Sequence, residues 1–306
     1  MGRYIVRRLL QMIPVILGTT FLIFAMVFAT GDPLKGRCGE RPCSPAYAAA
    51  FTQEYHLDQP LIVQYLFYLG KVLQGDLGTN FYGNAVSSEL LQRYPTTIKL
   101  AIIAILVELI LGIAAGVLTG IRKGTFVDNL VLVSTLVVIS IPVFVIGALA
   151  QLIFGVRLGL FPVTATQGTL DQLILPGIVL GSLSVAYVTR LTRANLVENL
   201  RSDYVRTAKA KGLTRSRTVT VHTLRNSLIP VITYIGADIG SLMGGAIVTE
   251  RIFNINGVGG FIFRSINQRD GVSVVGAVTV LVVIFLLANL IVDLLYGVLD
   301  PRITND

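Results

Sequence analysis

Charged side chains are scarce in this chain of 306 residues: 14% are Asp, Glu, Lys or Arg, while 53% are hydrophobic. A soluble domain carries roughly 25% charged residues, so this sequence has too few to solvate the surface of a water-soluble protein. Intrinsic disorder is also excluded, because it requires low hydrophobicity. With its mean hydropathy of +0.74, the sequence predicts an all-α polytopic membrane protein.

The residues that several catalytic chemistries need are missing too. The sequence has no Gly-x-x-x-x-Gly-Lys-Ser/Thr loop for phosphates, which predicts that the chain does not hydrolyse ATP itself. Its two histidines, His56 and His222, fall outside the long hydrophobic runs, so no imidazole is available inside a membrane as a base or metal ligand. We therefore predict a non-catalytic chain with no metal site and no cofactor of its own.

Six stretches are long and apolar enough to cross a bilayer, for which a helix needs about 20 mainly apolar residues. Four of them carry no charge, and two are each interrupted by one acid, Glu108 or Asp238. The six predicted spans are 12–29, 100–121, 129–156, 172–189, 230–249 and 271–292. They divide the chain into a first helix with its N-terminal flank (1–29), a loop region (30–95) and a five-helix core (96–306).

The basic residues are segregated between these spans, and the net charge is +8. The denser basic flanks precede the first span and follow the second, fourth and sixth. The positive-inside rule then places both termini in the cytoplasm and 30–95 outside. The cytoplasmic loop at about 190–228 holds nine of the 25 basic residues. Because topology accounts for the charge, nucleic acid is not a predicted partner, whereas membrane lipid is.

The only two cysteines, Cys38 and Cys43, lie in the loop predicted to be outside. Four intervening residues can be bridged, and an oxidising exterior permits a disulfide. A metal site needs more ligands than two thiols, and no His lies nearby. A local disulfide is the favoured interpretation, with two free thiols as the alternative.

Two stripes of glycine repeat every four residues within predicted spans. Such spacing lets helix backbones approach closely in lipid, so close packing is the expected meaning of both. The stripes are Gly112, Gly116 and Gly120, and Gly236, Gly240 and Gly244.

Asp238 lies about 200° around its helix from the glycines on either side. Its own face holds Tyr234 and Ser241, and an acid inside a membrane needs a protein or water partner. We interpret this polar face as lining an aqueous translocation pathway, with a buried structural hydrogen bond as the alternative. Glu108 has no such companions, and a structural role is equally compatible with its surroundings.

Motifs spread along the whole chain are similar to one family. They occupy 3–9, 31–33, 57–60, 64–65, 75–78, 203–213, 224–230, 289–296 and 300–302, together with Glu250, Phe253, Gly257 and Gly259. On this ordered set, the chain resembles a permease subunit of the dipeptide/oligopeptide class of ABC importers. The sequence departs from the family pattern at Arg206, where the broader signature begins with Glu, and at Asn256, where Pro is usual.

The resemblance implies a fold, partners and a location. The expected fold is the type I ABC importer permease fold with six transmembrane helices and a long external loop after the first. The expected partners are a second homologous permease, two ATPase subunits or domains that bind ATP and Mg, and an extracytoplasmic peptide-binding protein. The expected location is a bacterial or archaeal cytoplasmic membrane. Alternatives are the same type of permease for nickel or glutathione, or a stand-alone secondary transporter or channel.

The resemblance also identifies 203–213 as the segment that contacts the ATPase. The residues assigned to this coupling are Asp203, Tyr204, Arg206, Ala208, Ala210, Lys211 and Gly212. Tyr204 and Ala208 share one helical face, the two alanines are small enough for close docking, and Gly212 is a plausible helix stop. A solvated basic connector is the alternative interpretation of this loop.

Overall fold

The computed structural model describes residues 2–29, 33–38 and 43–299. Gly31, Asp32 and residues 300–302, which carry two of the family motifs, lie outside the described part. Within that part the only strand-like pairing is an isolated bridge between Thr79 and Ala85, and the rest of the regular structure is helical. The chain forms two compact units, 1–97 with 256–306, and 98–255.

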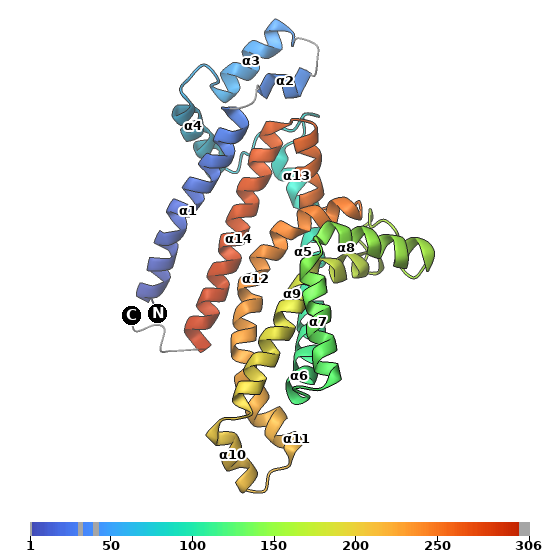
Figure 1. Ribbon diagram of the computed structural model, residues 1–306. Coiled ribbons are helices and arrows are strands. Elements are labelled where there is room, and N and C mark those ends of the chain that lie inside the picture. Colours follow the sequence, from blue (N-terminus) through green and yellow to red (C-terminus); the bar gives the residue numbers. More distant parts are fainter. Residues whose placement is uncertain (1, 30–32, 39–42, 300–306) are drawn as a thin grey trace. The chain divides into compact units, whose positions relative to one another are not determined.

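The first unit pairs the two ends of the chain. The first helix, α1, lies beside the last, α14 (Figure 1). A hydrophobic cluster of Phe24, Tyr65 and Val275 joins these two helices to α4. The Tyr65 hydroxyl is 2.8 Å from Thr20 Oγ1. The helices of this unit are α1 (Gly2–Phe28), α2 (Pro33–Cys38), α3 (Pro45–Tyr55), α4 (Leu61–Leu73), the start of α5 (Val86–Val107), α13 (Val258–Asn267) and α14 (Gly271–Leu299).

The second unit is built around α9, which packs against α6 on one side and α12 on another. Its helices are the rest of α5, η1 (Glu108–Gly112), α6 (Ile113–Ile121), α7 (Phe126–Ser140), α8 (Val143–Ala150), η2 (Gln151–Arg157), α9 (Leu170–Asn199), α10 (Asp203–Ala210), α11 (Arg215–Arg217), η3 (Thr218–Thr223) and α12 (Leu224–Ile252). The segments labelled η are π-helical turns that continue the neighbouring α-helices.

The first glycine stripe packs as predicted. A Cβ added to Gly112 would lie 2.7 Å from Val188 Cγ1, and one added to Gly116 would lie 2.4 Å from Thr192 Cβ. Gly120 faces α9 in the same way. In the second stripe, among the described residues, nothing lies within 4 Å of a Cβ built on Gly244, so close packing is not found at that glycine.

Five helices are long and apolar enough to cross a membrane, and a sixth crossing depends on a bent pair. The run 129–156, expected as one span, is two helices that meet at 104°. Ile141 there is extended (φ −97°, ψ 127°) and precedes Pro142, which disfavours helical backbone in the residue before it and supplies no N–H. Hydropathy alone does not detect such a break.

Candidate functional site: a loop helix and a buried acidic cluster

The segment 203–213 begins with a short helix, as expected. Asp203 lies in the first turn of α10 and Lys209 in the last, which matches the charge preference of a helix dipole. The helix ends before Gly212, whose φ of +78° is left-handed. The Gly212 amide donates to the Lys209 carbonyl (3.0 Å) and the Leu213 amide to the Ala208 carbonyl (3.2 Å). These bonds satisfy the last turn of the helix.

The inner face of α10 is covered by its own chain. Val205 and Ala208 are buried, with 0% and 7% of their surface exposed, and the helix packs against η3. At the spacing i, i+3 Ala208 shares the buried face with Val205, so within this chain it does not lie on the exposed side of the helix with Tyr204. The remaining residues assigned to coupling are exposed, namely Asp203, Tyr204, Arg206, Ala210, Lys211 and Gly212.

Both ends of the loop are anchored to long helices. The Tyr204 hydroxyl donates to Asn199 Oδ1 (2.9 Å) at the end of α9. At the start of α12, Ser227 Oγ donates to the Asn195 carbonyl on α9 (3.3 Å). Figure 1 shows α10 and α11 beyond the ends of α9 and α12. Tyr204 thus ties α10 to the end of α9, and α9 is bonded in turn to the start of α12.

An ion pair also joins α9 to the first turn of α7, and the sequence did not predict it. Arg193 Nε is 2.5 Å from Asp128 Oδ1, and Arg193 Nη2 donates to Asp128 Oδ2 at 2.7 Å. The Gly124 amide donates to the same Oδ2 (2.8 Å), and Thr125 caps α7 by accepting from the Asp128 amide (3.4 Å). Thr125 and Asp128 have the spacing of a capping box, which is the sequence signal that would have drawn attention to this acid.

Asp238 lies at the contact of α12 with α9. Its Oδ2 accepts a hydrogen bond from Ser184 Oγ at 2.5 Å, and the rings of Tyr234 and Tyr187 stack with centroids 6.0 Å apart. Tyr234 and Asp238, two of the three residues assigned to a pathway, thus belong to one cluster. Ser241 is exposed and, among the described residues, does not join this cluster through a hydrogen bond.

Glu108 completes the acidic cluster, although its sequence neighbours gave no sign of it. It is the first residue of η1, with 0% of its surface exposed. Neither of its carboxylate oxygens has a hydrogen-bond partner among the described residues. The carboxylate lies within electrostatic range of Asp238 and Tyr234. Single π-helical turns inside α-helices frequently occur at functional sites.

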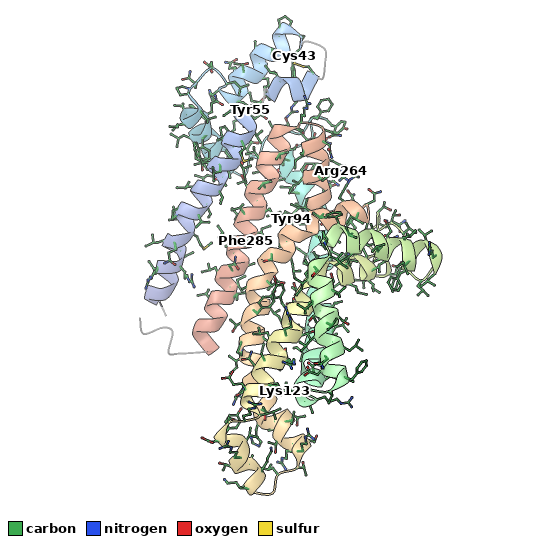
Figure 2. The ribbon with its side chains drawn as sticks, in the orientation of Figure 1. Cys43, Tyr55, Tyr94, Lys123, Arg264 and Phe285 are labelled. Carbon is green, nitrogen blue, oxygen red and sulfur yellow. A yellow bond between two sulfur atoms is a disulfide. The ribbon has the colours of Figure 1, made fainter. Side chains whose placement is uncertain are left out.

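The first unit holds a disulfide and, beside it, a second buried ion pair. Cys38 and Cys43 are bonded, with their Cα atoms 5.3 Å apart, in the α2–α3 region marked by Cys43 in Figure 2. Arg37 lies 3.5 Å from Asp270, and both side chains are almost fully buried. Asp270 also accepts from the Phe81 amide (2.7 Å). The sequence gave no indication of this pair, whose members are far apart in the chain.

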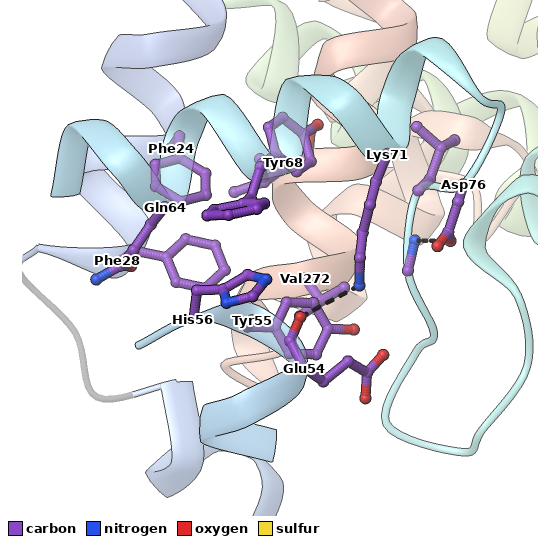
Figure 3. Close-up of a pocket in the computed structure, with 14 residues that line it drawn as sticks. Phe24, Phe28, Glu54, Tyr55, His56, Gln64, Tyr68, Lys71, Asp76 and Val272 are labelled. Carbon is purple, nitrogen blue, oxygen red and sulfur yellow. Dashed lines mark hydrogen bonds between the residues drawn. The ribbon is translucent and has the colours of Figure 1, made fainter. Parts of the chain in front are cut away.

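A small pocket lies in the same unit, between α1, α3, α4 and α14 (Figure 3). Aromatic and polar side chains line it together, and Lys71 Nζ donates to the Glu54 carbonyl at 3.2 Å. Burial raises the pKa of Tyr68 to about 12, so its hydroxyl stays protonated beside Thr279 Oγ1, 2.7 Å away. Among the described residues, no group of three or more His, Cys, Asp or Glu side chains is arranged to hold a metal ion.

Two family models match nearly the whole chain. Residues 112–305 match the binding-protein-dependent transport system inner membrane component, and residues 1–101 match the N-terminal part of the corresponding membrane component. The chain is 38% identical to a di/tripeptide transport system permease protein of Pseudomonas aeruginosa, over 99% of this chain and 98% of the relative. It is 37% identical to a dipeptide transport system permease protein of Escherichia coli (100% and 99%) and 36% identical to an oligopeptide transport system permease protein of Bacillus subtilis (99% of each).

Proposed function

Because the chain belongs to the family of binding-protein-dependent transport system inner membrane components, we propose that it forms part of the translocation pathway of an ATP-driven importer of dipeptides or oligopeptides. It is a multi-pass inner membrane permease with the type I ABC importer fold. The observation that carries the peptide assignment is similarity over the full length to permeases named for di-, tri- and oligopeptide transport. Nickel and glutathione remain the alternative cargoes.

The importer requires further subunits. The family supports a second homologous permease, two ATPase subunits or domains that bind ATP and Mg, and an extracytoplasmic peptide-binding protein. In this arrangement the present chain is a non-catalytic transport subunit, and ATP hydrolysis belongs to its partners. The basic loop at 190–228 faces the cytoplasm with both termini, and the disulfide-bonded segment faces the oxidising exterior.

The exposed face of α10 is the proposed contact with an ATPase subunit. Two structural features support this role: the inner face of the helix is covered by its own chain, and Tyr204 ties the helix to the end of α9, which is itself bonded to the start of α12. The exposed residues Arg206, Ala210 and Lys211 would then contact the partner. A rigid helix with one free face is suited to transmit movement from a soluble motor.

Transport by the reconstituted complex tests the cargo assignment. Proteoliposomes containing both permeases and the ATPases, supplied with the binding protein and ATP, should accumulate a labelled dipeptide, and unlabelled dipeptides should compete. Nickel and glutathione should not compete. Accumulation of nickel or glutathione without dipeptide uptake would contradict the proposal.

A matched pair of tryptophan substitutions tests the coupling face. Ala210 and Ser216 are both small and exposed in the same loop, but only Ala210 lies on α10. Overpacking a close-fitting contact costs about 1–3 kcal/mol, which weakens docking by roughly tenfold to a hundredfold. Ala210→Trp should therefore reduce ATPase recruitment, whereas Ser216→Trp should not. Equal recruitment by both variants would contradict the assignment.

A further inference from the structure

The acidic cluster in the second unit lacks a counter-charge. Glu108 is fully buried and has no partner among the described residues. Asp238 is bonded only through Oδ2, to the neutral hydroxyl of Ser184. No ion pair between either carboxylate and a Lys, Arg or His side chain occurs in the described part of the chain. A buried carboxyl group without a partner is neutralised by taking up a proton, which leaves the half-buried Asp238 as the carboxylate that can receive a cation from outside the chain.

The surroundings of the cluster indicate what kind of cation fits. Asp238 is half-buried, whereas Glu108 is fully buried, so of the two acids only Asp238 is partly accessible. The Tyr187 ring is 49% exposed and stacks on Tyr234 beside the acid. Aromatic rings attract organic cations, and carboxylate and hydroxyl oxygens accept the three N–H donors of an ammonium group.

Three elements contribute to this arrangement. The chain supplies Glu108 from η1, Ser184 and Tyr187 from α9, and Tyr234 and Asp238 from α12. Because α9 packs against both η1 and α12, the two acids lie on helices that share one neighbour. The titratable groups facing Asp238 are the other acid and the two tyrosines, and none of these is cationic.

We propose that Asp238 binds the ammonium group of the peptide cargo during its passage through the membrane. In this site the Tyr187–Tyr234 pair forms an aromatic wall beside the carboxylate. The inference rests on the function proposed above, because it names the part of the cargo that the permease recognises.

Titration of the cargo provides the test. The α-amino group of a peptide titrates near pH 8, so raising the pH removes the proposed ligand charge. Uptake of a dipeptide with uncharged side chains by the complete reconstituted importer is measured from about pH 6.5 to 9. Each rate is divided by the amount that the binding protein captures at the same pH. The wild-type ratio should fall as the pH rises through about 8.

The variants separate recognition from structure. Asp238→Asn should slow uptake about tenfold at neutral pH, the loss expected for one charge-assisted hydrogen bond, and should abolish the pH dependence. Asp238→Glu should recover both. The control Asp171→Asn removes an exposed acid from the first turn of α9 and should behave as wild type.

Several results would overturn the site. One is wild-type uptake by Asp238→Asn, and another is slow uptake by that variant with the wild-type pH dependence retained. If Asp238→Asn fails to assemble, Tyr187→Leu replaces it, because its half-exposed side chain can be changed without opening the core. Tyr187→Leu should raise the KM severalfold, and an unchanged KM and pH profile would refute the site. Absence of dipeptide uptake by the wild type would instead refute the proposed function itself.

Discussion

One of the closest helix contacts described in the second unit predicts a large effect from one methyl group. A Cβ on Gly116 would lie 2.4 Å from Thr192 Cβ and 2.8 Å from the Thr189 carbonyl oxygen. Neither neighbour can rotate away, because one is the branch point of a stiff side chain and the other is backbone. Gly116→Ala therefore forces α6 and α9 apart, and we expect it to lower the free energy of unfolding by about 1–3 kcal/mol.

Gly244→Ala is the matched control. Both glycines lie inside helices, where Ala is favoured over Gly by roughly 0.5–1 kcal/mol, but nothing described lies within 4 Å of a Cβ on Gly244. The control should be neutral or slightly stabilising. Reversible unfolding in mixed micelles with increasing SDS, followed by circular dichroism, gives both free energies. Stability of Gly116→Ala equal to that of the control would refute the close approach of the two helices.

A double-mutant cycle at the next turn checks the same contact from both sides. A Cβ on Gly120 would lie 2.9 Å from Leu196 Cδ2, an atom that Leu196→Ala removes. The cost of Gly120→Ala should therefore be smaller in the Leu196→Ala background. Contacting residues show interaction energies of about 0.5–3 kcal/mol, and additivity of the two changes would argue against the contact.

Three further predictions concern charges and thiols. Asp128→Asn should destabilise the protein by about 1–3 kcal/mol, because it removes the charged hydrogen-bond partner of Arg193, whose side chain is 21% exposed. SDS unfolding measures the loss, and wild-type stability of the variant would contradict a contribution of this ion pair to stability. Asp270→Asn leaves Arg37 without its counter-charge and should therefore speed proteolysis of the 33–55 segment. Proteolysis at the wild-type rate would contradict a role for this ion pair in holding the segment in place. With 30–95 outside, an impermeant thiol reagent should label Cys38 and Cys43 in whole cells only after reduction, and labelling solely in inverted vesicles would reverse the proposed orientation.

The membrane-spanning architecture was largely predictable because a helix that crosses a membrane is recognised by its length and apolar composition alone. Five of the six predicted runs are continuous helices in the structure. The remaining run, 129–156, breaks at Pro142. A hydropathy window averages over this proline and cannot register its effect on backbone geometry. The stripe containing Gly116 was identified by its spacing, but spacing could not show that Gly244 would have no close neighbour among the described residues.

The candidate site was predictable only where a short segment carries the information. The sequence located the helix that ends before Gly212, yet it could not show which face the chain itself covers, and Ala208 proved to be buried. Contacts between distant segments, such as that of Asp128 with Arg193, leave no local periodicity. The same reason applies to Glu108, whose role depends on two helices that follow it in the chain.

The bend at Pro142 has a consequence for biogenesis. Each arm of the bent pair has 15 residues, about 22 Å at 1.5 Å per residue, which is less than the roughly 30 Å of hydrocarbon in a bilayer. The extended backbone at Ile141 also needs protein cover at membrane depth, and α8 packs against α9 and α12, which are synthesised later. The newly made 126–157 segment must therefore wait near the translocon or the bilayer surface until those helices arrive, so that a truncation before α12 should leave it incompletely inserted.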